Sequence, residues 1–450
     1  MNNRNRIGLV VALAALAGSA WPQAKLAQAP PMGWNSWDSF GTSVTEAEVK
    51  ANADYMAKNL AKHGWQYIVV DIQWSEPNPQ THGYRPNAEL AMDSNGRLVP
   101  ATNRFPSAAN GKGFKPLADY VHSRGLKFGI HIMRGIPRRA VDANLPVIGT
   151  QAKAADIADK KSTCMWNGDM YGVDMTKAGA QEYYDSIVKM YAEWGLDFMK
   201  ADDMFGSGPS GDHSSEIEAL GKAIRKSGRP IVLSLSPGTR DAKTVAAFSQ
   251  YAQMWRISGD FWDRWVDLKR QFPNLAKWSQ YSKPGNWPDA DMLPLGKIGI
   301  RAERGAPRMS LLTHDEQRTL MTLWSVARSP LMFGGNLPDN DDFTLSLIAN
   351  DEVLAVNQKA AASKELFSRD NQVAWVAEIA GSPAKHLAVF NLGDAGEEEI
   401  GVKWSELGLP PNCTVHDLWT GKDIAAQEGR TFKVGPHASA FFRVSPSNTK

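Results

Sequence analysis

Short apolar segments alternate with longer amphipathic segments between about residues 30 and 335. A short apolar run is typical of a buried strand, and apolar positions three or four residues apart are typical of a helix. The pattern predicts strands at 32–34, 67–71, 127–132, 197–202, 231–235, 254–257, 289–293 and 330–333. Strands that alternate with helices predict parallel βα units with right-handed crossovers. An open doubly wound sheet would also fit, but eight units in one region favour a (β/α)₈ TIM barrel.

Two of the intervening helices carry clear signals at their ends. Thr45 is a good N-cap for a helix that runs to Lys62, and Gly64 is a good stop. A second helical segment covers residues 177–194, and Gly195 ends it just before the fourth strand. The helices therefore separate the predicted strands as a barrel requires.

After about residue 360 the pattern changes to short alternating runs separated by Gly, Pro and Asn, which is typical of antiparallel strands. These runs lie at 373–378, 386–391, 399–402, 414–417, 431–434 and 440–444. We therefore predict a catalytic barrel at 30–358 and a C-terminal antiparallel β-sandwich domain at 359–450. No ionisable cluster is found in the sandwich, so we expect a structural or accessory role for it.

The N-terminus has the pattern of a signal peptide. Arg4 and Arg6 precede an apolar stretch at 7–17, and small residues follow at 18–20. The apolar stretch is too short to span a bilayer, although an uncleaved anchor is the alternative. We expect a signal peptide at 1–20, a linker at 21–29, and a secreted or periplasmic protein with no membrane attachment after cleavage.

Composition narrows the class of protein. The chain is 43% hydrophobic and 22% charged, and 50 basic against 48 acidic residues leave a net charge of +2. Such a balance gives no strong field for nucleic acid. Cys164 and Cys413 are the two cysteines, and no metal-ligand spacing such as H-E-x-x-H occurs. We expect no disulfide between them, no metal and no cofactor, and homo-oligomerisation stays open.

Charged or titratable residues gather where the predicted strands end, which in a barrel is where catalytic residues lie. They are Asp71, His131, Lys200, Asp202, Arg256, Asp260, Asp289 and Asp291. A single Asp after a strand is most often a helix cap. Five strands that end in this way are poorly explained by capping, so we predict an active site at this face.

Two of these carboxylates have the surroundings that glycoside hydrolysis requires. Lys200 and Asp202 share one face of a strand, and a nearby lysine keeps a carboxylate ionised, as a nucleophile needs. Asp260 follows another strand between aromatic residues, which we expect to limit water around it, as suits a general acid. The spacing of such a pair decides between retention and inversion, and the residues alone leave both open.

A glycine-rich segment at 206–211 fits the dinucleotide-binding pattern G-x-G-x-x-G. However, three residues separate it from Asp202, Pro209 stiffens the turn, and the next strand does not end in an acidic residue. A nucleotide-dependent oxidoreductase is therefore the weakest alternative, and we interpret the segment as a loop beside the active site.

Six motifs in order resemble glycoside hydrolase family 27, the α-galactosidase (melibiase) and α-N-acetylgalactosaminidase family. They are M-G-W-N-S-W at 32–37, D-F-M-K-x-D at 197–202, W-R-x-x-x-D at 255–260, W-P-D-A-D-M-L at 287–293, and segments at 316–331 and 350–358. The resemblance covers nearly the whole chain after residue 29. It implies a retaining mechanism with Asp202 as nucleophile and Asp260 as acid/base. It also implies substrate-binding roles, which fall to Trp34, Asp71, Lys200, Arg256 and Asp291.

The residues expected to read the sugar depart from the family pattern. Where galactosidases show D-D-C-W, this chain has Asp71-Ile72-Gln73-Trp74, so one of two aspartates that bind the 4- and 6-hydroxyls is replaced. His131 stands where the family often has Tyr. Ser236 lies in the loop that reads the 2-substituent, where the family often has S-C-E-W-P or S-C-S-W-P. Met204 replaces the cysteine that the resemblance would pair with Cys164.

The sequence therefore predicts a retaining, exo-acting α-glycoside hydrolase that takes an α-linked oligosaccharide or glycoside, with α-galactosidase favoured. The alternatives keep this mechanism on another glycone: α-glucosyl or isomaltosyl, β-L-arabinopyranosyl, or α-N-acetylgalactosaminyl. A non-catalytic carbohydrate-binding protein is a further alternative, and the presence of both carboxylates with their basic partners disfavours it.

Overall fold

The structure is a computed structural model, and it describes residues 26–447 apart from 82, 206–212, 239–243 and 303. The predicted signal peptide at 1–20 and the glycine-rich segment at 206–211 lie outside the described residues. Among the helices that are described, none combines the length and the apolar character needed to cross a bilayer.

Eight parallel strands form the barrel, in the order β10-β9-β8-β7-β3-β2-β1-β13. A parallel bridge between Leu293 and Phe333 joins the two ends of this sheet, so the fold class predicted from the sequence is confirmed. The strands are β1 (Met32–Asn35), β2 (Tyr67–Val70), β3 (Lys127–Met133), β7 (Phe198–Asp202), β8 (Val232–Leu235), β9 (Met254–Arg256), β10 (Trp287–Asp289) and β13 (Leu331–Phe333). The seventh strand begins two residues earlier than predicted and ends before Asp291, where a φ of 89° breaks the extended backbone.

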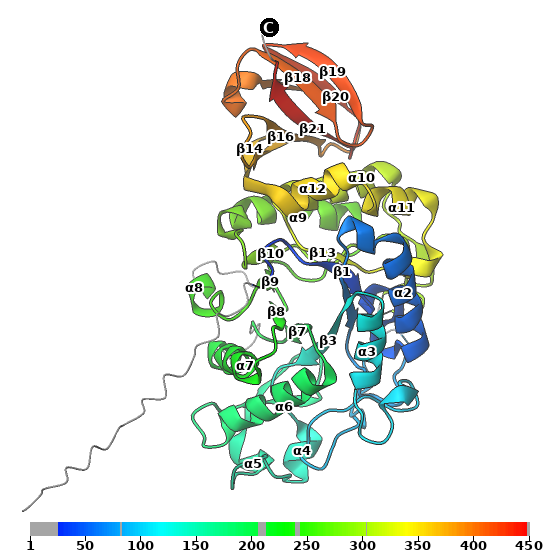
Figure 1. Cartoon of the computed structure of the whole chain (residues 1–450), viewed down its shortest axis with the longest axis vertical. Helices are drawn as coiled ribbons and strands as arrows, with labels where there is room; N and C mark the ends of the chain where they lie inside the picture. The colour runs from blue at the N-terminus through cyan, green and yellow to red at the C-terminus, as the bar shows by residue number, and fades with distance from the viewer. Residues whose placement is uncertain (1–25, 82, 206–212, 239–243, 303, 448–450) are drawn as a thin grey trace, which may run out of the picture.

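Helices follow the barrel strands and cover their outer side (Figure 1). They are α1 (Trp37–Phe40), α2 (Glu46–Asn59), α3 (Lys115–Ser123), α6 (Ala180–Trp194), α7 (Ser214–Ser227), α8 (Val245–Phe248), α9 (Trp265–Trp278), α10 (His314–Ala327), α11 (Asp342–Ile348) and α12 (Asp351–Lys359). Thr45 caps α2, as predicted, in a capping box with Glu48. Gly195 ends α6 in a left-handed conformation that glycine adopts without strain.

Two small antiparallel sheets interrupt the βα alternation, and the sequence pattern did not predict them because their strands are short or polar. The first lies between β3 and α6 and contains β4 (Ile136–Pro137), β5 (Ala158–Thr163) and β6 (Met170–Val173), with α4 (Arg138–Asp142) and α5 (Ala154–Ile157) beside them. The second pairs β11 (Lys297–Ile298) with β12 (Arg308–Met309) before α10. The β5–β6 connection and the β11–β12 connection each contribute a residue, Trp166 and Arg304, to the mouth of the barrel.

The C-terminal strands form a six-stranded antiparallel sheet, β14-β15-β16-β21-β18-β19, and a two-stranded sheet, β17-β20. They are β14 (Ala360–Arg369), β15 (Gln372–Ile379), β16 (Lys385–Asn391), β17 (Glu398–Lys403), β18 (Asn412–Asp417), β19 (Lys422–Gln427), β20 (Gly429–Val434) and β21 (Ser439–Pro446). All six predicted runs are strands, whereas β14 and β19 were not predicted. Alternation along β15 sends Trp375 to the barrel side and Val376 into the space between the two sheets.

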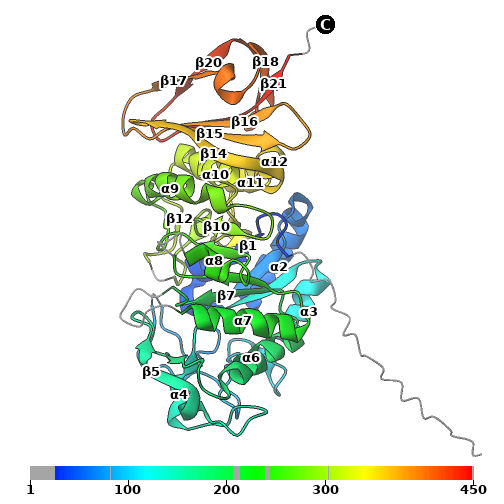
Figure 2. The same ribbon diagram turned by 90° about the vertical axis from the view of Figure 1, so that its left-hand side faces the viewer.

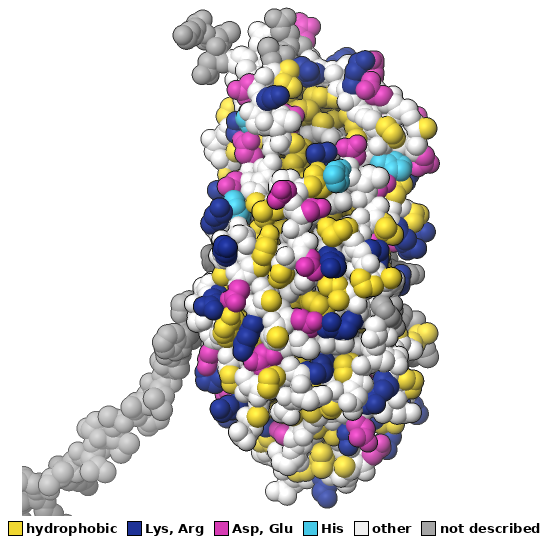
Figure 3. Space-filling model, turned by 90° about the vertical axis from the view of Figure 1, so that its right-hand side faces the viewer, with side chains coloured by type: hydrophobic (Ala, Val, Ile, Leu, Met, Phe, Trp, Pro, Cys, Tyr) yellow, Lys and Arg dark blue, Asp and Glu magenta, His cyan; other side chains and the backbone are white. Residues whose placement is uncertain are grey.

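Helices α9, α10 and α12 lie between the barrel and the C-terminal sheets in both views (Figures 1 and 2). His437 stacks on Trp265 of α9 at 3.9 Å between ring centroids, and its Nδ1 lies 2.7 Å from Glu316 of α10. His416 lies 3.0 Å from Glu352 of α12. Basic and acidic side chains are interspersed on the face in Figure 3, as the balanced composition leads us to expect.

Candidate active site

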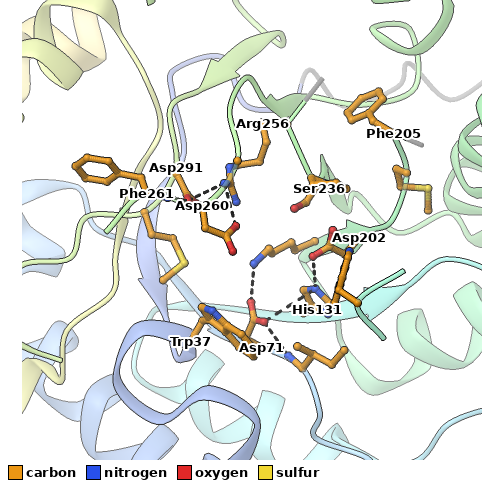
Figure 4. Close-up of a pocket in the computed structure, with 18 of the residues that line it drawn as sticks. Trp37, Asp71, His131, Asp202, Phe205, Ser236, Arg256, Asp260, Phe261 and Asp291 are labelled. Carbon is orange, nitrogen blue, oxygen red and sulfur yellow. Dashed lines mark hydrogen bonds and ion pairs between the residues drawn. The ribbon is translucent and has the colours of Figure 1, made fainter. Parts of the chain in front are cut away.

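A cavity of about 1200 Å³ opens where the barrel strands end, and its lining includes residues at or just after the ends of β1, β2, β3, β7, β8, β9 and β10. Figure 4 shows side chains from different strands converging there. The predicted site residues that line the cavity are Asp71, His131, Lys200, Asp202, Ser236, Arg256, Asp260 and Asp291. Trp34 and Asp289 were also predicted at this face, and they do not line the cavity. The parallel strands thus gather residues up to 220 positions apart at one edge, as the barrel predicts.

Asp202 ends β7 with its carboxylate inside this cavity. Its Oδ2 lies 3.1 Å from Nε2 of His131, and its Oδ1 accepts a hydrogen bond from the Asp203 amide at 2.8 Å. Burial raises the pKa of the Asp202 carboxyl, but the hydrogen bond and charge of His131 and the charge of Lys200 outweigh it and lower this pKa to about 2. The carboxylate is therefore ionised at neutral pH, as a nucleophile must be.

Arg134 holds the backbone on which this carboxylate sits. Its amide donates to the Asp202 carbonyl oxygen at 2.9 Å, and its guanidinium donates to Oδ2 of Asp203 at 2.7 Å and to Oε1 of Glu216 at 2.6 Å. Asp203 has a φ of 60°, so the chain turns sharply straight after Asp202. Arg134 is buried and was not predicted, because no spacing in the sequence links it to α7.

Lys200 pairs with Asp71 rather than with Asp202. Its Nζ donates to Oδ2 of Asp71 at 2.9 Å, and the same oxygen accepts from Nδ2 of Asn35 at 2.7 Å. The prediction that Lys200 and Asp202 share a strand face holds, but the long lysine side chain reaches across to the end of β2. Burial raises the pKa of Asp71, and the charges of His131 and Lys200 outweigh it, so the pKa is lowered. Asp71 is thus an ionised acceptor at the cavity wall.

Asp260 stands at the mouth of the cavity. Its side chain is 48% exposed, and its Oδ1 lies 3.3 Å from Nη2 of Arg256. The expectation that flanking aromatics limit water around it is wrong for the free protein, because Phe261 and Trp262 are themselves buried in the barrel wall. An exposed carboxyl at the cavity mouth can be reached both by a leaving-group oxygen and by water, as a group that donates and then accepts a proton requires.

Asp291 and Asp38 are buried carboxyls on the cavity wall. Asp291 forms an ion pair with Nη2 of Arg256 at 2.7 Å and accepts a hydrogen bond from the Phe261 amide at 2.8 Å. Burial raises its pKa, with the charges of Asp260 and Asp289 adding to the effect and Arg256 opposing it. Burial likewise raises the pKa of Asp38 well above its usual value. Asp38 directly follows the M-G-W-N-S-W motif and was not predicted as a site residue.

Trp34 belongs to the barrel core, so the prediction that it packs on a sugar is wrong. Its side chain is fully buried, and its Nε1 donates to the Gly335 carbonyl oxygen at 2.8 Å. Trp37, three residues later, lines the cavity instead and stacks on Tyr84 with ring centroids 5.8 Å apart. The chain leaves β1 after Asn35, so the second tryptophan of the same motif is the one that reaches the mouth.

The wall beside Asp71 is apolar. Ile72 is buried and packs with Met133, Cys164 and Met170. Cys164 and Cys413 are both free thiols, as predicted. Ile72 lines the cavity next to the carboxylate of Asp71, so a hydrogen-bond acceptor and an apolar side chain that offers none lie side by side in this wall.

Ser236 follows β8, and its side chain lines the cavity between the strands that carry Asp202 and Arg256. Its backbone is tied to the β7 side, because the Ser236 amide donates to the Ala201 carbonyl oxygen and the Met204 amide donates to the Ser236 carbonyl oxygen. Within the described residues, no group of three or more His, Cys, Asp or Glu is placed to hold a metal ion. The side chains that line the cavity carry carboxylate, imidazole, ammonium and guanidinium groups.

Comparison with known proteins places this geometry among sugar-cleaving enzymes. The family described as alpha galactosidase A matches residues 29–178 and 165–359, and the alpha galactosidase C-terminal beta sandwich domain matches residues 369–444. Alpha-galactosidase of Cyamopsis tetragonoloba is 30% identical over 94% of this chain and 87% of its own length. That of Coffea arabica is 31% identical over 93% of this chain and 94% of its own.

A solved structure is more similar. The crystal structure of a GH27 β-L-arabinopyranosidase from Geobacillus stearothermophilus superimposes with a TM-score of 0.92 and 52% sequence identity, over 94% of this chain and 98% of that chain. Both the barrel and the C-terminal sheets are therefore shared with it.

Proposed function

Because the chain belongs to glycoside hydrolase family 27 and is a glycosidase, we propose that it removes terminal β-L-arabinopyranosyl residues from glycosides, with retention of configuration. Ile72 is the observation that carries the choice of sugar. It is buried in an apolar cluster directly after Asp71, where the galactosidases of the family have a second aspartate.

The two candidate glycones, β-L-arabinopyranosyl and α-D-galactopyranosyl, differ at one position. A β-L-arabinopyranosyl unit has the ring of an α-D-galactopyranosyl unit without the hydroxymethyl group. A 6-hydroxyl placed against Ile72 would lose its hydrogen bonds to water and find no acceptor, which costs about 1–3 kcal/mol. A pentopyranose has no such hydroxyl. The 52% identity to a β-L-arabinopyranosidase supports the same choice.

The catalytic steps use two carboxyl groups. In the first step Asp202 attacks the anomeric carbon while Asp260 donates its proton to the glycosidic oxygen, so the aglycone leaves and a glycosyl ester forms on Asp202. In the second step Asp260 takes a proton from water, and the water oxygen attacks the anomeric carbon and releases Asp202. A pKa of about 2 for Asp202 supports its role, because the nucleophile must be ionised while Asp260 is protonated.

The other cavity residues bind and orient. Asp71, whose Oδ2 lies 2.9 Å from Nζ of Lys200, accepts hydrogen bonds from the hydroxyls at the end of the sugar ring away from the anomeric carbon. Arg256 orients Asp260, with Asp291 as its buried counterion at 2.7 Å. We also assign sugar contacts to Trp37, His131 and Ser236, which line the same cavity.

An α-galactosidase is the second candidate, because the plant relatives at 30 and 31% identity carry that activity in their names. It uses the same two carboxylates and differs only in accepting the hydroxymethyl group. For location we propose a secreted or periplasmic protein, on the basis of the charged, apolar and small-residue pattern of residues 4–20.

Hydrolysis of 4-nitrophenyl β-L-arabinopyranoside and 4-nitrophenyl α-D-galactopyranoside tests the proposal. We expect a higher kcat/KM for the arabinopyranoside, by about 10- to 200-fold, the range that one small substituent supports. Asp202→Ala abolishes both activities, Asp260→Ala reduces them by orders of magnitude, and Asp315→Asn, an exposed helix position, is the matched control. Proton NMR of the first sugar released reports retention. Preferred cleavage of the galactoside would overturn the choice of glycone, and an inverted product would overturn the mechanism.

A further inference from the structure

The position of the acid/base fixes where the leaving group lies. Asp260 protonates the glycosidic oxygen in the proposed function, on which this inference rests, and that oxygen leaves with the aglycone. The aglycone must therefore contact the cavity wall beside Asp260, on the side away from Asp71 and Ile72. The cavity volume of about 1200 Å³ exceeds the range of about 300–1,000 Å³ that encloses a drug-sized ligand. One pentopyranose therefore leaves much of it unfilled.

Two side chains extend the cavity wall from Asp260 to the rim. Trp262 follows Asp260 by two residues, and Arg304 comes from the connection between β11 and β12; both line the cavity. The guanidinium of Arg304 lies over the Trp262 ring, 5.6 Å from its centroid, which is a cation–π arrangement. Trp262 is buried whereas Arg304 is exposed, so the ring anchors a cation that faces the mouth.

This connection is braced against the acid/base loop. Arg308 pairs with Asp263 through two contacts, of 2.8 and 2.6 Å, and Asp263 is buried one residue after Trp262. A third donor of Arg308, Nη1, donates to the carbonyl oxygens of Arg304 and Ala306 at 3.0 and 3.2 Å. The backbone that carries Arg304 is therefore tied to the backbone that carries Asp260.

The charge of Arg304 is uncompensated among the described residues. Three other arginines of this region each have a carboxylate partner: Arg256 has Asp291, Arg301 has Glu48 and Arg308 has Asp263. Arg304 forms no ion pair in the part of the chain that the structure describes. A guanidinium is a planar fork that matches a carboxylate with two parallel hydrogen bonds. An unpaired fork beside the leaving group therefore favours an anionic aglycone.

We propose that Trp262 and Arg304 form an aglycone subsite for a carboxylate-bearing residue, such as a uronic acid, with Arg304 binding the carboxylate. Two phenyl glycosides test this: one carries a 4-carboxylate and the other carries the neutral 4-carboxamide. The corresponding glycosyl fluoride serves as a third substrate whose leaving group is too small to reach the subsite. All three carry the β-L-arabinopyranosyl glycone.

The key quantity is the ratio of kcat/KM for the carboxylate to that for the carboxamide. Arg304→Met keeps much of the aliphatic stem over Trp262 and lowers this ratio about fivefold, since an ion pair at a rim contributes up to about 1 kcal/mol. The difference in intrinsic reactivity between the two leaving groups cancels when the ratio for Arg304→Met is divided by the ratio for wild type, because both proteins are assayed on both substrates. Raising the salt concentration lowers the ratio for wild type but not for Arg304→Met. Arg225→Met is the matched control, because Arg225 is also an exposed arginine over a ring, that of Tyr251, outside the cavity.

An unchanged ratio in Arg304→Met overturns the proposal, and so does an equal loss on both phenyl glycosides, which indicates a neutral aglycone. A loss on the fluoride as large as that on the carboxylate overturns it too, because Arg304 then acts on the glycone or on folding. The fluoride separates this inference from the proposed function. If wild type cleaves α-D-galactopyranosyl fluoride and not the arabinopyranosyl fluoride, the proposed glycone is wrong. The subsite is then tested with the same three leaving groups on α-D-galactopyranose.

Discussion

The charge state of the nucleophile depends on one histidine, and His131→Phe tests this. Nε2 of His131 lies 3.1 Å from Oδ2 of Asp202, and the His131 side chain is almost completely buried. Phenylalanine fills a similar volume but supplies neither the hydrogen bond nor the charge. We therefore expect the pKa of Asp202 to rise in the variant.

The size of the effect follows from the structure. The carboxyl of Asp202 has a pKa of about 2 in place of the ordinary 3.8, and a difference of one in pKa corresponds to about 1.4 kcal/mol. The environment thus favours the ionised form by about 2 kcal/mol. Burial acts in the opposite direction, and without His131 the charge of Lys200 and the hydrogen bond from the Asp203 amide oppose it, together with the charge of Arg256. The pKa of Asp202 in the variant is then expected to rise by about 1–3, the range for loss of a close opposite charge.

The assay is the pH dependence of kcat/KM on the glycosyl fluoride, whose leaving group depends little on proton donation. The acid limb of wild type stays below about pH 3, and that of His131→Phe moves up by about one to three pH units. His131→Tyr restores a neutral donor without a charge and gives an intermediate value. His122→Phe is the control, because it removes a His–Asp pair of 2.7 Å, with Asp197, outside the cavity. An acid limb in His131→Phe that coincides with that of wild type would refute this reasoning.

Three further predictions follow from other parts of the structure. Ile72→Asp raises the ratio of kcat/KM for the galactoside to that for the arabinopyranoside at least tenfold, and an unchanged ratio would refute the role of Ile72. The same variant lowers the free energy of unfolding, measured by urea denaturation, by about 1.5–3 kcal/mol, because a buried apolar side chain is lost. Arg134→Leu lowers the free energy of unfolding by about 3–5 kcal/mol, because it leaves buried carboxylates unpaired; a loss under 1 kcal/mol would contradict this. Hydrogen bonds that the His416 ring donates to Glu352 and Asp423 raise the pKa of His416, so its contribution to stability is full below about pH 6.5 and is lost as the pH rises through the folded pKa. The melting temperature of His416→Gln should therefore fall short of wild type most at low pH, and a deficit that grows with pH would contradict this.

The barrel was predictable because its strands are buried on both sides. The run at residues 67–70 is continuously apolar, and that at 231–235 is interrupted only by Ser234. A polar residue, Asp71 or Ser236, follows each run, and the barrel places both at the same edge. The strand β5, with the sequence ADKKST, has no such signal, so the excursion between β3 and α6 was missed. In the sandwich, β14 and β19 were missed because exposed edge strands need not alternate.

The candidate site was predictable in its residues but not in its pairings. The sequence places Lys200 two positions from Asp202. The long lysine side chain nevertheless pairs with Asp71, which follows β2. Trp34 and Trp37 belong to one motif, and only the end of β1 decides which of them reaches the cavity. Arg134 and Arg304 carry no sequence signal, because their partners lie in distant segments.

The covalent intermediate is the central claim, and trapping it is the most direct test. The protein is incubated with 2-deoxy-2-fluoro-β-L-arabinopyranosyl fluoride, in which the electronegative substituent slows release of the ester. Peptide mass spectrometry then locates the label. We predict one fluoroglycosyl group on Asp202, with loss of activity that recovers as the ester turns over. A label on Asp203 or Asp260, or turnover of this compound through an inverted product with no labelled residue, would contradict the account.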